Sequence, residues 1–198
     1  SNFMATFITV FKQKGFTVHT LFYTNDQKLI TADSILSKRF SDTVIHTGSK
    51  SNREFYINEF KKGFPNGFVI PEFGIHEAGL KGLNHLWKDI EETNLPDYLF
   101  FDIGTGFTVL SALAYFKEKE IQLIGVAIGN KIDKIPNDLA ANAEKLGLDK
   151  SILSKLKILE PTTSPAFASK NKTLEDWIRK VWKEKQIPLE PVYSGKTL

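Results

Sequence analysis

The alternation of apolar, strand-like runs with amphipathic, helix-like stretches limits the fold of this chain more than any other feature. Runs rich in β-branched and aromatic residues predict strands over residues 17–23, 44–46, 68–70, 98–103 and 121–128. Helical spacing of apolar residues predicts helices over 1–14, 27–40, 51–62, 77–93 and 106–119, with further helices after Pro136 and from Thr173. Because no hairpin signal joins neighbouring strands, we expect parallel sheets covered by helices on both faces. The predicted fold class is therefore α/β.

The strongest interruption of this alternation is the segment Lys-Lys-Gly-Phe-Pro-Asn-Gly at residues 61–67. Glycine and proline together break both helical and strand patterns. We therefore predict a small α/β domain over residues 1–65 and a larger α/β domain over residues 66–198.

Composition excludes several classes of function. The net charge is only +3, from 26 basic and 23 acidic residues, and the charges alternate along helix-like stretches, so no nucleic-acid surface is expected. No apolar run approaches the roughly 20 residues that a membrane span needs. The chain has no cysteine, which excludes disulfides and thiolate chemistry and fits a cytoplasmic protein. The four histidines are scattered without metal-ligand spacing, so no metal site is predicted.

Ligands of parallel sheets bind in the loops at the carboxyl ends of strands. The loop Asp-Ile-Gly-Thr-Gly-Phe-Thr at 102–108 follows a predicted strand and opens a predicted helix. Its glycines let backbone N–H groups approach an anion, its threonines add donors, and the helix dipole favours negative charge. It lacks both the Lys-Ser/Thr of a P-loop and the third glycine of the dinucleotide fingerprint. The pattern predicts a phosphate-binding loop, and the alternative is a tight turn with a threonine cap.

Two further loops carry polar groups. The segment Pro71-Glu72-Phe73-Gly74 follows the strand predicted at 68–70, and it is equally compatible with a simple turn into the next helix. The segment 187–196 joins a predicted short strand to Tyr193. A buried tyrosine whose hydroxyl needs a partner would explain that segment without a catalytic role.

These loops match one family in order and over the length of the chain. The Ser1-Asn2 pair, with Gly15-Phe16 after the first helix, is similar to a Ser-Asn loop, and residues 71–74 resemble Pro-Glu-Gly-Gly. Residues 104–108 are similar to Gly-Thr-Gly-Gly-Thr, and residues 187–196 resemble Ile-Pro-Leu-Asp-Pro-Val-Tyr-Thr-Gly-Lys. The chain thereby resembles the 1-aminocyclopropane-1-carboxylate deaminase and D-cysteine desulfhydrase family of pyridoxal-phosphate enzymes. That resemblance implies two three-layer, parallel-sheet α/β domains of the tryptophan-synthase-β type, incomplete at both ends, and a homodimer.

The resemblance also implies a cofactor, a substrate and a set of site residues. Pyridoxal phosphate would be the cofactor, and a small amino acid such as D-cysteine or 1-aminocyclopropane-1-carboxylate would lose ammonia to give a 2-oxo acid. Tyr193 would be catalytic, against the pyridine ring. The cofactor would be bound by Asn2, Gly104, Thr105, Gly106, Thr108 and Ser194. The substrate would be bound by Ser1, Glu72 and Gly74.

The residue expected at the ring nitrogen, Ser194, separates the two activities. The deaminases carry glutamate at this position, whereas desulfhydrase-like members carry a hydroxyl residue. A carboxylate keeps the pyridine nitrogen protonated and strengthens the electron sink, and a hydroxyl does so less. Ser194 therefore favours the desulfhydrase side of the family.

The chain departs from the family pattern in two ways. The Schiff-base lysine of the family lies in a Gly-Asn-Lys motif upstream of the Ser-Asn loop, so we expect these 198 residues to be the middle of a longer protein. The Gly129-Asn130-Lys131 motif follows the wrong strand, and we interpret it as a coincidence.

The second departure concerns three phenylalanines at pocket positions. Phe3 stands where the family has His or Gln, and Phe73 and Phe107 stand where it has glycine. A phenylalanine ring buries on the order of 150–250 Å², so three rings would fill the pocket unless they turn into the core. We therefore expect a blocked or remodelled site. A cofactor-free relative with a binding or structural role is the alternative function, and a general phosphate-ligand binder is a weaker third.

Overall fold

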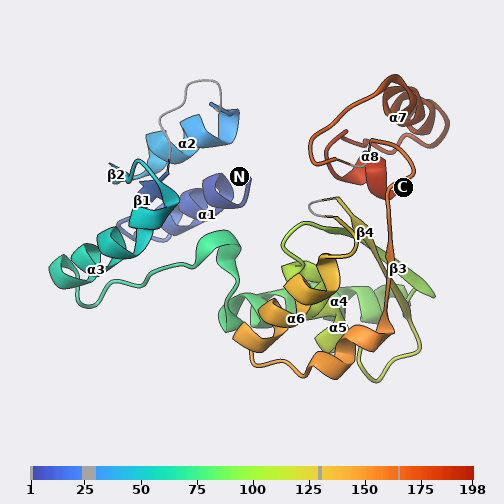
Figure 1. Ribbon diagram of the computed structural model, residues 1–198, viewed down its shortest axis with the longest axis horizontal. Coiled ribbons are helices and arrows are strands. Elements are labelled where there is room, and N and C mark those ends of the chain that lie inside the picture. The colour runs from blue at the N-terminus through green and yellow to red at the C-terminus, as the bar shows by residue number, and fades with distance from the viewer. Residues whose placement is uncertain (1, 24–29, 129–130, 165) are drawn as a thin grey trace. The chain divides into compact units, whose positions relative to one another are not determined.

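The computed structural model describes residues 2–23, 30–128, 131–164 and 166–198 (Figure 1). The chain forms two compact units, Ser1–Gly74 and Ile75–Leu198. Each unit holds its own sheet, of two strands in the first and three in the second. All strand pairs in both sheets are parallel, which confirms the α/β fold class expected from the sequence.

The first unit places a pair of parallel strands among helices. Its elements are α1 (Asn2–Gln13), β1 (His19–Phe22), α2 (Ala32–Phe40), β2 (Thr43–His46), a 3₁₀ turn at Lys50–Asn52, α3 (Arg53–Gly63) and a 3₁₀ turn at Glu72–Gly74. Asp42 connects three of them, because its carboxylate accepts hydrogen bonds from Lys12 Nζ at 2.7 and 2.8 Å and from the Val18 N–H at 2.7 Å. The end of α1 is thereby fixed beside the starts of β1 and β2.

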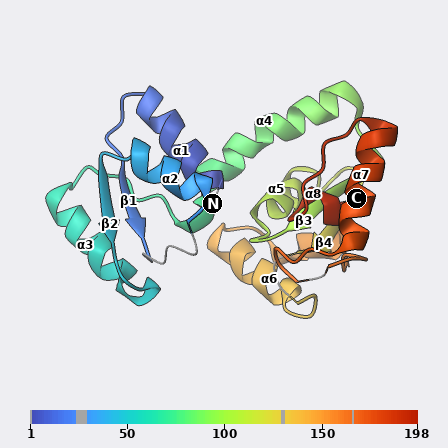
Figure 2. The same ribbon diagram turned by 90° about the horizontal axis from the view of Figure 1, so that it is seen from above.

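The second unit has the element order of a βαβ protein. Its elements are α4 (Glu77–Asn94), β3 (Tyr98–Ile103), α5 (Phe107–Tyr115), β4 (Gln122–Ala127), α6 (Ile135–Lys145), a 3₁₀ stretch at Lys150–Lys155, β5 (Leu156–Leu159), α7 (Lys172–Lys185) and α8 (Ser194–Thr197). The sheet order is β3-β4-β5, with Tyr98 opposite Gln122 and Leu123 opposite Leu156. Figure 2 shows the same unit from above, with α8 between β3 and α7.

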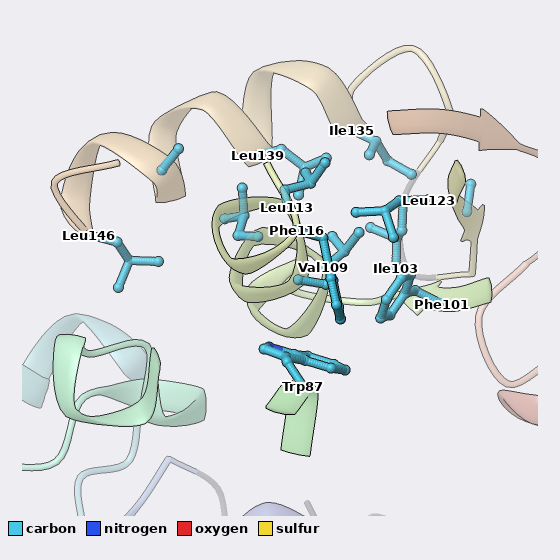
Figure 3. Close-up of a cluster of buried hydrophobic side chains, with 14 residues drawn as sticks. Trp87, Phe101, Ile103, Val109, Leu113, Phe116, Leu123, Ile135, Leu139 and Leu146 are labelled. Atoms are coloured by element: carbon cyan, nitrogen blue, oxygen red, sulfur yellow. The ribbon is translucent and has the colours of Figure 1, made fainter. Parts of the chain in front are cut away.

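The core of this unit lies between the sheet and the helices α4, α5 and α6. Figure 3 shows Trp87 of α4 on one side of α5 and Leu139 of α6 on the other, and both belong to one buried cluster. The indole N–H of Trp87 donates to Ser111 Oγ at 2.8 Å, so the one polar atom of this ring is satisfied in the core. The central strand β4 is buried from Leu123 to Ala127, as expected for a strand covered on both faces.

Three local expectations differ from the structure, and one strand was not expected. Residues 68–70 form no strand: the Phe68 side chain is 66% exposed, and an isolated extended segment lacks the pairing and burial that stabilise a strand. The short strand expected before Tyr193 is replaced by a turn. The helix expected over 106–119 ends at Tyr115, where the following Phe116 is almost fully buried. Strand β5 was not predicted, because Leu-Lys-Ile-Leu is too short to show a clear period.

Within the described residues, none of the helices is both long enough and apolar enough to cross a membrane.

Candidate functional site

The loop between β3 and α5 has two glycines with different structural tasks. Gly106 has a φ of +78°, and a Cβ added there would lie 2.1 Å from Leu139 Cδ2, so both its backbone conformation and its packing require glycine. A Cβ added at Gly104 would meet no atom within 4 Å. Gly106 therefore shapes the loop against α6, whereas Gly104 leaves its outer side open to a ligand.

The start of α5 offers hydrogen-bond donors to that open side. The first N–H groups of an α-helix have no carbonyl partner within the helix, and they carry the positive end of the helix dipole. Gly106 is the N-cap and has no side chain to satisfy them, and the contact from the Phe107 N–H to Thr105 Oγ1 is long, at 3.4 Å. Thr108 in the first turn is exposed. This donor set suits an oxyanion such as phosphate.

The segment before α8 is organised by Glu190, a residue that the sequence analysis did not single out. Its carboxylate accepts hydrogen bonds from the N–H groups of Val192 at 2.7 Å, Tyr193 at 2.6 Å and Ser194 at 2.8 Å. In return, Ser194 Oγ accepts from the Glu190 N–H at 2.9 Å. These reciprocal bonds resemble a capping box, and they explain why the segment turns instead of forming a strand.

Helix α8 is joined to the end of β3. Thr197 Oγ1 donates to Asp102 Oδ1 at 2.6 Å, and Asp102 lies two residues before Gly104. Figure 1 shows α8 above the sheet that contains β3 and β4. Tyr193 and Ser194 therefore belong to the same carboxyl edge of the sheet as the 104–108 loop. The structure brings these two groups of sequence-predicted site residues together within one unit.

The phenol of Tyr193 is partly exposed at this edge. The exposed fraction of the residue is 39%, and its ring meets that of Phe167 edge-on, with centroids 6.0 Å apart. Partial burial raises the pKa of Tyr193, and the negative charges of Glu190 and Asp102 raise it further. Both effects stabilise the protonated phenol, so the hydroxyl is a hydrogen-bond donor at this edge of the sheet.

Lys196 is the buried cation of this region. The residue is 5% exposed, and its Nζ donates to the Ala166 carbonyl at 2.7 Å and contacts Ser169 Oγ at 3.4 Å. Burial lowers the pKa of Lys196, although the charge of Glu190 acts in the opposite direction. Lys196 thereby anchors the segment that carries Phe167, the neighbour of Tyr193.

In the first unit, Glu72 and its neighbours form a loop with an unusual backbone. The Glu72 carboxylate lies 2.9 Å from Lys50 Nζ and 3.9 Å from Arg53 Nη1. Phe73 has a φ of +59° and Gly74 a φ of +68°. Position 73 thus has the left-handed backbone that favours glycine, the residue of the resembling family, although its side chain is phenylalanine.

The remaining predicted positions are described only in part. Asn2 begins α1, but its side chain and that of Phe3 lie outside the described part of the chain, as does Ser1. The Gly129-Asn130 pair also lies outside it. Phe107 packs against the buried cluster of the second unit, so this ring turns towards the core. Among the described residues, no three or more histidines and carboxylates gather as metal ligands.

Comparison with known proteins finds likeness in structure alone. Serine racemase from Dictyostelium discoideum superimposes with a TM-score of 0.61 at 13% identity, covering 98% of this chain and 64% of that one. Maize serine racemase gives 0.59 at 13% identity, covering 98% and 61%. A pyridoxal 5′-phosphate-dependent aspartate racemase gives 0.57 at 9% identity, covering 98% and 62%. No family model matches, and no curated protein matches.

These similarities show the fold. The chain has the α/β fold with parallel sheets of these racemases, which confirms the fold class expected from the sequence. It spans less than two thirds of the length of the racemases that it matches. The closer assignment to deaminases and desulfhydrases stays a prediction.

Proposed function

We propose that this chain is part of a pyridoxal-phosphate-dependent enzyme that acts on a small amino acid. The observation that carries the proposal is the Thr197–Asp102 hydrogen bond, which holds the Tyr193 segment at the same sheet edge as the 104–108 loop. Such a cofactor needs a loop that binds its phosphate and a side chain beside its ring. The 104–108 loop and Tyr193 would supply these two parts at the carboxyl edge of the parallel sheet. The shared fold with a pyridoxal 5′-phosphate-dependent aspartate racemase supports the same class.

The residues of the 104–108 loop fit the cofactor at its phosphate end. The open side of Gly104, the first-turn N–H groups of α5 and the exposed Thr108 form a donor set for a dianion. At the ring end, Ser194 Oγ accepts a hydrogen bond from the Glu190 N–H at 2.9 Å and donates to Glu190 Oε1 over a long 3.5 Å. If it turned its proton away from Glu190, Ser194 would donate to a pyridine nitrogen.

In this proposal the chain binds and orients, and it holds one proton ready. Gly104, Thr105, Gly106 and Thr108 would hold the phosphate. The Tyr193 hydroxyl, whose pKa is raised, would hold a proton next to the reacting carbon or leaving group. When bound, pyridoxal phosphate supplies the electron sink for the carbanion formed from the amino acid.

The finer proposal concerns substrate and product. A desulfhydrase-like elimination from D-cysteine, or a deaminase reaction of 1-aminocyclopropane-1-carboxylate, would release ammonia and a 2-oxo acid. Ser194 favours the first. Ser1, Asn2, Glu72 and Gly74 would contact the substrate or cofactor from the first unit. A cytoplasmic homodimer completes the proposal, and sedimentation velocity of the full-length protein tests the dimer.

A cofactor-free relative is the second candidate. Phe73 favours it, because a ring stands on a backbone of glycine-like conformation at a position where the resembling family has glycine. Phe107 no longer supports it, since that ring packs against the core.

The deciding experiment is a titration of the full-length protein with pyridoxal phosphate, followed by absorbance and by borohydride reduction. The enzyme should develop a visible band that borohydride abolishes, and peptide mass spectrometry should find the reduced cofactor on one lysine. D-cysteine and 1-aminocyclopropane-1-carboxylate are then assayed for 2-oxo acid release. Absence of the band, together with no retained cofactor after gel filtration, would establish the cofactor-free relative instead.

A further inference from the structure

One side chain of α6 is hydrogen-bonded to the loop between β3 and α5. Asn142 Nδ2 donates a hydrogen bond of 2.9 Å to the Thr105 carbonyl, across 37 positions of sequence. Leu139, one turn earlier on α6, packs against the next residue of the loop, Gly106. Asn142 and Leu139, one turn apart on α6, therefore contact two consecutive residues of the loop.

These two contacts fix the direction in which the Gly106 N–H points. In a trans peptide the C=O of one residue and the N–H of the next point in opposite directions. Because Asn142 draws the Thr105 carbonyl towards α6, the Gly106 N–H points away from α6. Leu139 leaves no room on the α6 side of Gly106, whose left-handed backbone then leads directly into the first turn of α5.

We propose that Asn142 is a positioning residue for phosphate binding, acting by orienting the peptide between Thr105 and Gly106. The inference rests on the proposed function, since it names the residue that prepares the phosphate loop. Without the amide donor, that peptide can rotate and withdraw the Gly106 N–H from the anion. Asn142 need not touch the phosphate for this effect.

The test compares substitutions at two asparagines of the same helix. Asn142→Leu removes the donor at similar size, and Asn142→Asp replaces it by an acceptor. Asn137 is exposed on α6, and Asn137→Leu and Asn137→Asp are the matched controls, the latter for the added charge. Affinities of the full-length protein for inorganic phosphate and for pyridoxal phosphate are measured by calorimetry. The ¹H–¹⁵N resonance and hydrogen exchange of the Gly106 amide are followed without ligand.

Both Asn142 variants should weaken each probe about tenfold, the scale of one hydrogen bond, and the Asn137 variants less than twofold. The Asn142 variants should also shift the Gly106 resonance in the ligand-free protein, which a general loss of stability would not do selectively. Unchanged affinity and an unchanged Gly106 resonance in folded Asn142→Leu protein would overturn the inference alone. If the unsubstituted protein binds neither probe, the proposed function fails and the inference falls with it. Should Asn142→Leu not fold, Asn142→Asp carries the comparison.

Discussion

At the scale of single residues, substitutions of the two glycines of the 104–108 loop should have opposite effects on stability. Gly106→Ala places a methyl group 2.1 Å from Leu139 Cδ2, and Leu139 is only 2% exposed and cannot move freely. The left-handed backbone adds about 1–2 kcal/mol for a residue with a Cβ. We expect Gly106→Ala to lower the free energy of unfolding by at least about 2 kcal/mol in urea titrations.

Gly104→Ala is the control at the other end of the same loop. Its Cβ meets open space, so we expect a change in the free energy of unfolding within about 0.5 kcal/mol. A loss as large as that of Gly106→Ala would mean that the loop packs differently from the structure described here. Affinity for phosphate should nevertheless fall in Gly104→Ala, because the new methyl group lies on the ligand side.

The 104–108 loop could be located from sequence as a candidate phosphate site because its signal is local. Glycine, threonine and the start of an apolar helix lie within seven consecutive residues. Asn142 and Thr197 carry no such signal, because their partners Thr105 and Asp102 lie 37 and 95 positions away. Only the tertiary fold gives these two residues their place in the site.

At the scale of elements, Glu190 holds the turn that starts α8. Removing its carboxylate in Glu190→Ala leaves the N–H groups of Val192, Tyr193 and Ser194 without this acceptor. We expect a loss of about 1–2 kcal/mol in the free energy of unfolding, the size of a helix-cap deletion. Glu190→Gln keeps one oxygen and should lie between the two proteins. Equal stability of all three would show that the turn forms without Glu190.

Asp42 makes the junction of α1, β1 and β2 dependent on pH. The hydrogen bond from Lys12, and then that from the Val18 N–H, lower the pKa of Asp42 below 3.8. The folded state therefore binds this proton less readily than the unfolded state, so the stabilisation is complete above pH 3.8 and disappears as pH falls through the folded-state pKa. We expect the stability difference between the unsubstituted protein and Asp42→Asn to shrink as urea titrations move from pH 6 to pH 2. A difference independent of pH would contradict this account.

The elements also show where sequence patterns stop being informative. The strands at 98–103 and 121–128 were predicted because each is a long apolar run, and the structure has them as β3 and β4. The run at 68–70 is also apolar, and the run before Tyr193 carries Leu189 and Val192 between prolines, but neither pairs with a neighbouring strand in the described part of the chain. Whether such a run becomes a strand depends on a partner that the local sequence does not contain.

At the scale of the whole molecule, the two units differ in how much apolar surface they bury. Among the described residues, the buried apolar side chains of the first unit are Ala5 and Ile8, whereas the second unit has a continuous cluster that extends from Trp87 to Leu146. Hydrophobic burial is the main stabilising term of folding. We therefore expect backbone amides of β1 and β2 to exchange with deuterium faster than those of β3 and β4 in the full-length protein. Equal protection in both sheets would contradict this expectation.

The same exchange measurement separates a site built by the second unit alone from one that both units share. A ligand at 100 times its Kd stabilises the unit that binds it by about 2.7 kcal/mol, and slows exchange from its globally opened states accordingly. Pyridoxal phosphate held only by the 104–108 loop would protect β3 and α5 and leave β1 and β2 unchanged. In the proposed function Ser1, Asn2, Glu72 and Gly74 would contact the substrate or cofactor, so the proposal predicts protection of β1 and β2 as well once an amino-acid substrate is added. Slower exchange in the second unit alone would contradict a role for those four residues in binding. Unchanged exchange in both units would contradict binding of pyridoxal phosphate by this protein.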